Sequence, residues 1–450
     1  MSQNVVIVGG GIAGLSAAYD LARAGIAHTL FEKAPRLGGV IETQNQDGCV
    51  LELGPDSFIS AKPEALALIK ELGLEGEVIG SNDHQRTTHI LKHGKLVPLP
   101  EGVMMIVPTK VMPMVKSSLL GWGTKIGMAF ELLRRPKTYP DRSVAEFVVD
   151  HFGKETLDYL AEPLLSGVYG GDPRELSVNS VLPRFVDMET KYGSLGRAVM
   201  TAKRPPSAPG SSLFKTLASG LGTMIDALAT YANVKHAAVD AIERQSSGFR
   251  VRAGGSWMDA TNVILATPGP QAIPLLQGLD AELAKMLGTV PYSSSALVSL
   301  AFDEAKFDGQ RAGFGFLIPK VERDRMAAAT FVATKFPHRA PDNRILLRCF
   351  FGGTGDEAIL NESDESMITI AREELRRILG LTTAPLFTRV SRWPKSMAQY
   401  TVGHAVRMKE IKARAAAIPG LQLAGNAYDG IGLPDCVRTG RQAAKSIPRA

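Results

Sequence analysis

The chain opens on a glycine-rich turn between a short β-branched run and an apolar helical pattern, and this unit constrains the fold more than any other feature. Residues 5–8 lead directly into Gly9, Gly11 and Gly14, which fall in the G-x-G-x-x-G register. Apolar positions then repeat with helical spacing, and a second apolar strand ends at Glu32. Strand, glycine turn, helix, strand and acid in this order predict a dinucleotide-binding βαβ unit. The sequence therefore predicts an α/β chain with a Rossmann-like domain.

Each part of this unit has a physical task in binding a dinucleotide. Gly9 allows the tight turn, Gly11 lets the backbone approach a pyrophosphate, and Gly14 lets the helix pack close to the sheet. The helix N-terminus offers free N–H groups and partial positive charge to the phosphates. The carboxylate of Glu32 stands where it can accept hydrogen bonds from ribose hydroxyls, which disfavours a 2′-phosphate. An ordinary glycine turn remains the alternative for the motif alone.

A second glycine pair favours FAD over NAD as the nucleotide. Arg36, Gly38 and Gly39 follow Glu32 closely. Many FAD-dependent oxidoreductases carry such a pair, with backbone wrapped around the flavin side of the cofactor, whereas a simple NAD dehydrogenase does not need one. The alternative is a two-glycine hairpin on the way to the strand predicted at residues 49–53.

Length and composition bound the class of protein. At 450 residues the chain is long enough for two or three domains with an ample core. Its 45% hydrophobic and 21% charged residues are typical of a soluble globular protein. The net charge of +6 favours anionic ligands or an anionic membrane surface, although a merely soluble surface would show the same excess. The basic residues are scattered without a recognition motif, so we expect no nucleic-acid partner.

The cysteines indicate neither a disulfide framework nor a metal site. Cys49, Cys349 and Cys436 are far apart, and no Cys/His cluster has the spacing of metal ligands. This usage is typical of a reducing cytoplasm. The first predicted strand begins so close to Met1 that we expect no signal peptide, and no run of about 18 apolar residues predicts a membrane span.

The C-terminal region repeats the pattern of strand, glycine-rich turn and helix. A strand at residues 421–426 ends in Gly425 and Asn426, and the following helix begins near Leu433 and Pro434. Backbone N–H groups at that helix start can stabilise the negative charge that develops at the N1–C2=O2 edge of a reduced flavin. We therefore expect the two chain ends to build one cofactor site. An unrelated strand-turn-helix is the alternative.

Residues 102–135 form a distinct apolar and methionine-rich region with interleaved lysines and arginines. We expect one or more helices here. The region could line a large hydrophobic pocket, rest on a membrane surface or form a plain buried core. Composition alone leaves these three alternatives open.

Longer motifs resemble the oxygen-dependent, FAD-containing porphyrinogen oxidases of heme synthesis, which act on protoporphyrinogen IX or coproporphyrinogen III. The resemblance covers nearly the full length. It is carried by E-L-G-P-D-S-F at 52–58, E-P-L-L-S-G-V-Y-G-G-D-P at 162–173, Arg392-Trp393, Q-Y-T-V-G-H at 399–404 and G-I-G-L-P-D-C at 430–436. The second and last of these motifs are much more specific than the glycine fingerprint.

The resemblance implies a monoamine oxidase-like flavoprotein with three parts. A discontinuous FAD-binding domain would comprise residues 1–79, 212–275 and 389–450. An α+β substrate domain would comprise residues 80–99 and 276–388. Residues 100–200 would form a helical lobe, which some relatives use for membrane association.

The resemblance also implies roles for residues of the substrate pocket. Arg86 corresponds to a position that faces a substrate propionate, and Phe350 to an aromatic residue that stacks on a pyrrole ring. Gly167 lies in a segment that closes over flavin and substrate. Leu317 and Phe331 are further pocket candidates.

The expected cofactor-binding residues come from both glycine motifs, the C-terminal turn and the resemblance, which places Val239 near the adenine. They are Gly9, Gly11, Ile12, Ala13, Gly14, Glu32, Lys33, Gly38, Gly39, Val40, Gly54, Pro55, Asp56, Ser57, Val239, Ala266, Trp393, Gly425, Asn426, Gly432, Leu433 and Pro434.

The implied reaction is a six-electron oxidation of a porphyrinogen with O2 as acceptor and H2O2 as by-product. It needs no acid/base side chain or metal, because the flavin carries the difficult step. The alternatives are another flavin oxidase or desaturase of the amine oxidase superfamily, and a non-catalytic FAD-binding porphyrin carrier. We expect a cytoplasmic protein. Peripheral contact with the inner face of the cell membrane, a homodimer and transient contact with the next heme-pathway enzyme stay open.

Overall fold

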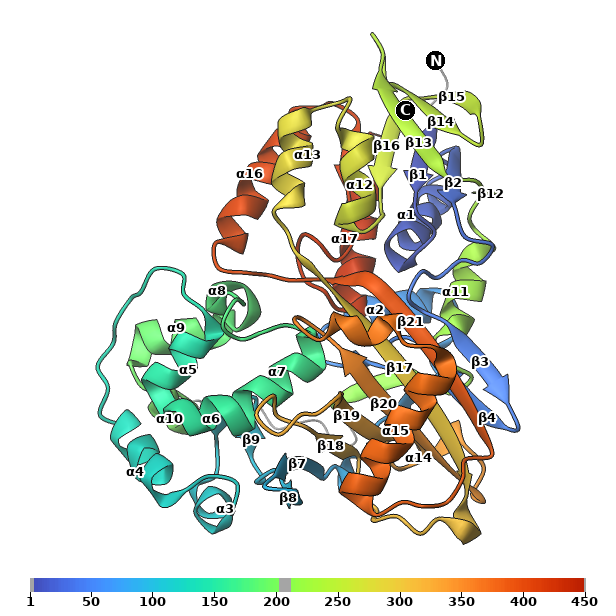
Figure 1. Ribbon diagram of the computed structural model, residues 1–450. Helices are drawn as coiled ribbons and strands as arrows, with labels where there is room; N and C mark the ends of the chain where they lie inside the picture. Colours follow the sequence, from blue (N-terminus) through green and yellow to red (C-terminus); the bar gives the residue numbers. More distant parts are fainter. Residues whose placement is uncertain (1–3, 202–211, 449–450) are drawn as a thin grey trace.

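The computed structural model describes residues 4–201 and 212–448, and its core is a parallel sheet built from both ends of the chain (Figure 1). The strand order is β12-β2-β1-β16-β22, and every neighbouring pair is parallel. The strands are β1 (Val5–Val8), β2 (His28–Glu32), β12 (Val234–His236), β16 (Asn262–Leu265) and β22 (Leu421–Leu423). All four residues of β1 are buried, as expected of a central parallel strand. The α/β prediction is confirmed.

Helices α1 (Ile12–Arg23) and α17 (Leu433–Lys445) pack directly against each other on this sheet. Their backbones approach so closely at Gly440 that a Cβ there would overlap the carbonyl oxygen of Ala13. Arg441 of α17 pairs with Asp20 of α1 at 3.0 Å. The first and last helices of the chain therefore form one rigid pair.

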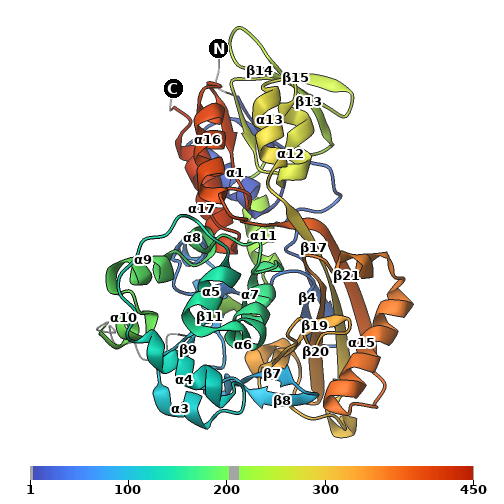
Figure 2. The same cartoon turned by 60° about the vertical axis from the view of Figure 1, so that its left-hand side comes forward.

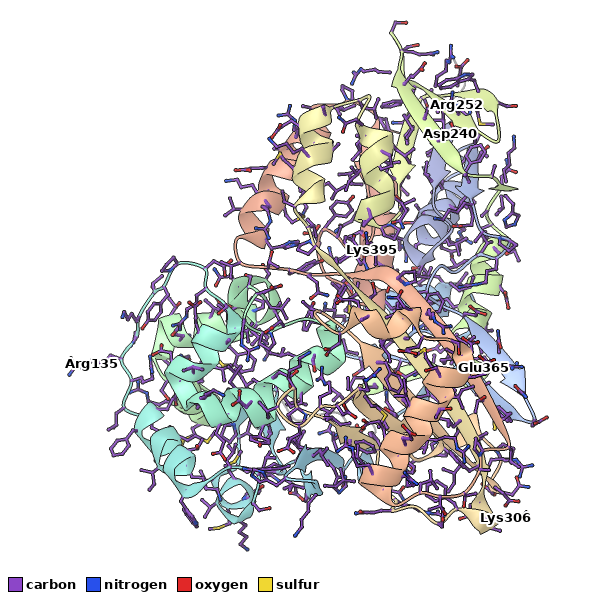
Figure 3. All side chains as sticks on the ribbon, in the orientation of Figure 1. Arg135, Asp240, Arg252, Lys306, Glu365 and Lys395 are labelled. Atoms are coloured by element: carbon purple, nitrogen blue, oxygen red, sulfur yellow. The ribbon has the colours of Figure 1, made fainter. Side chains whose placement is uncertain are left out.

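Smaller elements surround the parallel sheet. β3 (Thr43–Gln46) and β4 (Cys49–Glu52) form a hairpin, and β5 (Phe58–Ile59), β11 (Phe214–Leu217) and β6 (Val78–Gly80) form a three-stranded sheet. A third small sheet consists of β13 (Val239–Arg244), β14 (Phe249–Ala253) and β15 (Ser256–Ala260). Asp240 and Arg252 pair across β13 and β14 at 2.6 Å (Figure 3). The accompanying helices are α2 (Glu64–Glu71), α11 (Gly222–Ala229), α12 (Gly269–Leu276), α13 (Ala281–Gly288) and α16 (His404–Ala416).

A seven-stranded sheet forms the second large unit, in the order β21-β17-β20-β19-β18-β7-β8. Its strands are β21 (Phe387–Ala398), β17 (Tyr292–Asp303), β20 (Arg344–Gly352), β19 (Met326–Phe331), β18 (Gly315–Leu317), β7 (Thr88–Lys92) and β8 (Lys95–Pro98). Helix α15 (Asp364–Leu379) covers one face of this sheet, and the helical lobe lies on the other side (Figure 2). One face of the sheet therefore packs on α15, and the other face is turned toward the helical lobe (Figure 2).

The helical lobe contains the π-turn η3 (Leu157–Ala161) and eight α-helices, all within the described ranges. The α-helices are α3 (Val111–Lys116), α4 (Trp122–Glu131), α5 (Val144–Phe152), α6 (Lys154–Thr156), α7 (Glu162–Tyr169), α8 (Val178–Val181), α9 (Pro183–Tyr192) and α10 (Leu195–Thr201). Ser143 and Glu146 form a capping box that fixes the start of α5. Among the described residues, no helix is both long and apolar enough to cross a bilayer.

The apolar region at 102–135 divides into a buried and an exposed side. Its buried hydrophobic residues include Ile106, Val107, Met114, Leu119, Leu120 and Met128. Its exposed hydrophobic residues are Val111, Met112, Trp122, Ile126, Phe130 and Leu133, and Trp122 alone is 66% exposed. Helices α3 and α4 therefore contribute to the core of the lobe and also carry an apolar outer surface.

Candidate cofactor and substrate site

The first glycine turn leaves space where a pyrophosphate would lie. A Cβ at Gly14 would overlap the carbonyl oxygen of Gly9, so the helix packs on the turn only with glycine there. Gly9 has φ 107°, and a Cβ on it would lie 2.9 Å from the carbonyl oxygen of Ala266 at the end of β16. At Gly11, by contrast, a Cβ would meet nothing within 4 Å. The open side of the turn therefore lies at Gly11, directly before the N-terminus of α1.

The second glycine pair lies against this turn. The N–H of Gly38 donates to the carbonyl oxygen of Gly10 at 2.8 Å, and Gly11 and Gly38 form a parallel bridge. The guanidinium group of Arg36 holds the loop by donating to the carbonyl oxygens of Leu37, Gly39 and Ile41. The second glycine pair therefore lies beside the open space at Gly11.

Glu32, at the end of β2, links the two motifs. Its carboxylate accepts hydrogen bonds from the N–H of Gly10 at 2.7 Å and from the N–H of Ala34 at 2.8 Å. An ionised carboxylate has about four lone-pair directions, so acceptor capacity remains for ribose hydroxyls. Lys33 beside it is exposed, and Val239 is half-buried at the start of β13.

The segment after β4 joins the loop of the second glycine pair. A Cβ at Gly54 would overlap the carbonyl oxygen of Val40, so Gly54 lies on that loop. The indole N–H of Trp393 donates to the carbonyl oxygen of Leu53 at 2.6 Å. The guanidinium group of Arg36 lies 5.6 Å from the centroid of the Trp393 ring. The contacts thus bring together three stretches predicted to bind the cofactor: Gly38–Val40, the loop from Gly54 to Ser57 and Trp393.

The C-terminal turn supplies a second helix N-terminus next to the first. Gly440 packs on Ala13 and is seven residues after Leu433, so the start of α17 extends about 10 Å beyond the start of α1. Gly432 precedes Leu433 as the N-cap residue, and Pro434 occupies the first turn. A dinucleotide with its pyrophosphate at α1 would therefore place its other end near α17.

Buried polar groups hold the strand end before α17 in place. Asn426 accepts a hydrogen bond from the hydroxyl of Tyr292 at 3.3 Å and donates to the carbonyl oxygen of Ser396 at 2.8 Å. Burial raises the pKa of Tyr292 to about 12, so this hydroxyl remains a neutral donor. Gly425 donates its N–H to the hydroxyl of Thr439 in α17.

These residues fit an FAD molecule. The fit rests on the open space at Gly11, the spare acceptor capacity of Glu32 and the two neighbouring helix N-termini. The hydroxyl of Thr267, which lies beside Gly9, is buried without a hydrogen-bond partner in the described chain. Val40 is 39% exposed at the edge of this space.

Two of the five predicted substrate residues lie on one face of the seven-stranded sheet, and a third packs against that face. Phe350 of β20 pairs with Ala328 of β19, and Ala328 pairs with Leu317 of β18. Directly paired residues share a face, so Leu317 and Phe350 point to the same side. A Cβ at Gly167 of α7 would lie 3.4 Å from the side chain of Leu317. Leu317 and Phe350 are half-buried and Gly167 is exposed, as a pocket wall requires.

Phe331 corrects the sequence prediction, because it lies on the opposite face. It pairs with Leu347, which alternates with Phe350 along β20, and is 4% exposed. Its ring packs against Phe307 with the centroids 6.2 Å apart in the core beneath α15. The resemblance identified an apolar residue at position 331, but it did not specify the face of the sheet to which that residue points.

Arg86 lies after the 3₁₀ turn η2 (Asp83–Gln85), before β7, and is exposed. Among the described residues, its guanidinium group has no side-chain hydrogen bond or ion pair. The structure therefore does not join Arg86 to Phe350 or Leu317 by contacts. Its role against a propionate stays a prediction.

The sequence analysis did not identify two cations next to the predicted site, the buried Arg348 and the half-buried Lys335. Arg348, in β20, pairs with Asp56 at 3.2 Å, and Lys335, in α14 (Val332–Lys335), pairs with the same carboxylate at 3.0 Å. A charged residue within the apolar run of residues 345–351 is the signal that could have identified Arg348.

One further charged cluster lies in the helical lobe. Asp150, His151 and Glu189 have potential ligand atoms within 4.8 Å of one another. Arg134 and Arg142 already pair with Asp150, and Arg142 also pairs with Glu189. Because these cations balance the carboxylates, we assign no metal to this cluster.

The comparisons with known proteins agree with this geometry. The model of the family "Flavin containing amine oxidoreductase" matches residues 12–448. The chain is 35% identical to coproporphyrinogen III oxidase of Bacillus subtilis, with 98% of this chain and 97% of the relative covered. It is 32% identical to coproporphyrinogen III oxidase of Staphylococcus aureus, with 99% of each covered. It is 29% identical to chloroplastic protoporphyrinogen oxidase 1 of Arabidopsis thaliana, with 99% and 88% covered.

Solved structures show the same fold. A crystal structure described as a protoporphyrinogen oxidase from Exiguobacterium sp. 255-15 superposes with a TM-score of 0.89 at 33% identity, covering 99% of this chain and 98% of the other. Cyclohexylamine oxidase from Brevibacterium oxydans superposes with a TM-score of 0.70 at 16% identity, covering 99% and 98%. The second likeness concerns the fold alone, and both support the monoamine oxidase-like architecture expected from the sequence.

Proposed function

The chain belongs to the flavin containing amine oxidoreductase family, and on that premise we propose that it oxidises coproporphyrinogen III to the porphyrin with bound FAD and molecular oxygen. The observation that carries this proposal is the full-length similarity, at 35% and 32% identity, to two oxidases named for coproporphyrinogen III. The two relatives named for protoporphyrinogen, from Arabidopsis thaliana and Exiguobacterium, are 29% and 33% identical, both below the 35% of the Bacillus subtilis enzyme. We therefore favour coproporphyrinogen III, which has four carboxylates, over protoporphyrinogen IX, which has two.

The residues of the site suit such a reaction. When bound, FAD would supply the hydride acceptor and O2 the final oxidant, so removal of six electrons would consume three O2 and yield three H2O2. The protein has to hold a flexible apolar macrocycle, exclude water and bind its carboxylates. Leu317, Phe350 and the exposed Gly167 would form the apolar wall, and Phe350 would stack on a pyrrole ring. Arg86 would bind a propionate at the rim.

We propose no acid or base side chain for this chemistry. The protons would leave from pyrrole N–H groups and bridge carbons, and the backbone N–H groups at the start of α17 would favour negative charge on the bound cofactor. Leu433, directly after the N-cap residue Gly432, carries such an N–H group, whereas Pro434 has none. The chain's contribution is thus binding and preorganised electrostatics.

The exposed apolar face of α3 and α4 supports peripheral membrane contact at the inner face of the cell membrane. Trp122, Ile126 and Phe130 are 66%, 56% and 66% exposed on α4. Lys110 and Lys116 lie at the two ends of α3, where Lys110 pairs with Glu101, and Arg135 follows α4 and points outward at the edge of the lobe (Figure 3). Such a face can bind an anionic lipid surface without any spanning segment. The homodimer and the transient contact with the next pathway enzyme stay predictions.

A purified sample tests the function directly. We expect yellow flavin absorbance and an oxygen-dependent growth of porphyrin fluorescence, with a larger kcat/KM for coproporphyrinogen III than for protoporphyrinogen IX. Flavin absorbance without turnover of either substrate would instead favour the porphyrin carrier. Turnover of an amine in place of either porphyrinogen would favour an amine oxidase.

A further inference from the structure

A buried group of charged side chains lies next to Phe350 on the face that we assign to the substrate. Arg348 precedes Phe350 by two residues in β20, so both side chains point to the same side of the sheet. The β3–β4 hairpin packs on this face near Leu346, and Gly167 of α7 lies at the other end near Leu317. Arg348 therefore lies between the cofactor-side hairpin and the pocket wall.

Arg348 and Lys335 share one carboxylate. A side-chain nitrogen of Arg348 lies 3.2 Å from the carboxylate of Asp56, and the ammonium group of Lys335 lies 3.0 Å from it. Arg348 also donates to the carbonyl oxygen of Gly54 at 2.5 Å. The side chains of Arg348, Lys335 and Asp56 are 3%, 14% and 17% exposed. All three are therefore largely removed from bulk water.

The charges of this group do not cancel. The neighbouring ion pair of Arg339 and Glu52, 3.0 Å apart, is balanced on its own. Burial alone would raise the pKa of Asp56, but Lys335 and Arg348 hold it well below its ordinary value. Asp56 is thus ionised and neutralises one of its two cations. Within the described residues, neither Arg348 nor Lys335 pairs with another carboxylate, so one positive charge is left over.

A buried excess charge is costly unless an anion joins it. The structure also shows where coordination is incomplete, because the Nε atom of Arg348 is buried without a hydrogen-bond partner. An arginine binds a carboxylate best when two of its N–H groups can donate. The group has both the charge and a free donor for a carboxylate.

The spacing matches a substituted pyrrole. The guanidinium carbon of Arg348 lies 5.2 Å from the ring centroid of Phe350. Residues two apart on a strand are about 6.7 Å apart, which is close to the reach of a propionate arm from the pyrrole that carries it. A pyrrole stacked on Phe350 would therefore bring one carboxylate near Arg348.

We propose that Arg348 and Lys335, held by Asp56, form a second carboxylate subsite that binds one propionate of the porphyrinogen inside the pocket. This inference rests on the proposed function and deepens it. The subsite is separate from the rim position assigned to Arg86. A macrocycle with four propionates can fill both subsites in more orientations than one with two, so this subsite favours coproporphyrinogen III.

The test measures binding of a stable porphyrin to the FAD-loaded protein. Fluorescence quenching would give Kd for coproporphyrin III and for its tetramethyl ester, which has no carboxylates. We expect Arg348→Gln and Lys335→Gln each to weaken binding of the acid about tenfold and to leave binding of the ester within twofold. Arg348→Lys should restore part of the affinity. Arg392→Gln is the matched control, because Arg392 lies on the opposite face of the same sheet and pairs with Asp364.

The outcomes separate this subsite from other roles of the two cations. An equal loss of affinity for acid and ester would mean that the substitutions merely damage the pocket, and would overturn the proposal. Loss of FAD affinity with unchanged porphyrin Kd would assign the positive charge to the cofactor and would also overturn it. Because the assay needs no turnover, an inactive wild-type protein that still discriminates acid from ester would contradict the proposed oxidation and leave the subsite supported.

Discussion

Arg348 and Phe350 occupy the same face of β20, with the guanidinium carbon of one 5.2 Å from the ring centroid of the other. This pair joins two parts of the site, because Arg348 also contacts Gly54 and Asp56 in the loop assigned to the cofactor. A guanidinium group and an aromatic ring therefore lie next to each other where a macrocycle would contact the flavin.

Alanine at Gly11 and alanine at Gly14 should have different effects. The Cβ of Gly14→Ala overlaps the carbonyl oxygen of Gly9, so we expect loss of both thermal stability and flavin. The Cβ of Gly11→Ala meets nothing within 4 Å, so the apoprotein should keep its Tm. Since that Cβ would occupy the pyrophosphate space, FAD affinity should fall at least tenfold. Flavin absorbance and apoprotein melting curves measure the two quantities, and an unchanged FAD Kd in Gly11→Ala would contradict the assignment.

Phe350→Ala and Phe331→Ala form a matched pair on opposite faces of the sheet. Phe331 is buried in the core beneath α15, so its truncation should lower the free energy of unfolding by about 3–5 kcal/mol. Phe350 is half-buried on the substrate face, so its truncation should cost much less stability but lower kcat/KM at least tenfold. Urea unfolding and steady-state kinetics of both variants check this. A large loss of stability in Phe350→Ala together with a large loss of kcat/KM in Phe331→Ala would instead place Phe331 in the pocket and Phe350 in the core.

Arg86→Ala should raise KM for the porphyrinogen with little effect on the melting temperature. The reason for the small structural effect is that Arg86 is exposed and its guanidinium group has no partner in the described chain. A lost charge-assisted hydrogen bond to a propionate would reduce affinity by roughly tenfold. Arg86→Lys serves as the charge-retaining control. Unchanged KM and kcat in the alanine variant would remove Arg86 from the site.

Stability should decrease with rising pH because of His151. Its ring nitrogens lie 2.9 Å from Glu131 and 3.0 Å from Glu189. Burial lowers the pKa of His151, but the hydrogen bonds to the two carboxylates outweigh burial and leave the pKa above its ordinary value. A histidine with a raised pKa in the folded state stabilises fully below its unfolded value of about 6.5, and this contribution disappears as pH rises through the folded value.

His151→Gln is the test of this contribution. Removing one member of a buried charged group should lower the free energy of unfolding by about 3–5 kcal/mol at pH 6, with a smaller difference from wild type at alkaline pH. Urea unfolding at a series of pH values measures both proteins. A wild-type curve that is flat from pH 6 to pH 9 would show that His151 carries no charge in the folded state.

The outer face of α3 and α4 should govern binding to anionic vesicles. Trp122→Ser combined with Phe130→Ser removes two side chains that are each 66% exposed, so stability and kcat should stay near wild type. Partition onto vesicles that contain phosphatidylglycerol should fall severalfold, and added salt should weaken binding of the wild type. Sedimentation with the vesicles measures the bound fraction. Equal partition of both proteins would contradict membrane contact through this face.

The nucleotide unit could be predicted from the sequence because its determinants are local. Gly9, Gly11 and Gly14 act within a few residues of one another, and their spacing alone specifies the turn. The contact between Gly38 and Gly10 follows from the same short stretch of chain. The hairpin of β7 and β8 around His93 and Gly94 is likewise specified by a short stretch of chain.

Features that depend on distant segments were missed. Strand β21 runs from Phe387 to Ala398 at the edge of its sheet, where polar residues and Pro394 are tolerated, so it shows no clear alternation. The face occupied by Phe331 depends on its register with Leu347. The partners of Asp56 come from positions far along the chain, so no spacing rule could pair it with Lys335 or Arg348.

The close backbone contact between Ala13 and Gly440 has a consequence for biosynthesis. The ribosome makes α1 long before α17, so an emerging chain carries only half of its flavin cradle until α17 has been made. Holoenzyme assembly therefore has to follow the synthesis of α17, and removal of that helix would leave a colourless polypeptide.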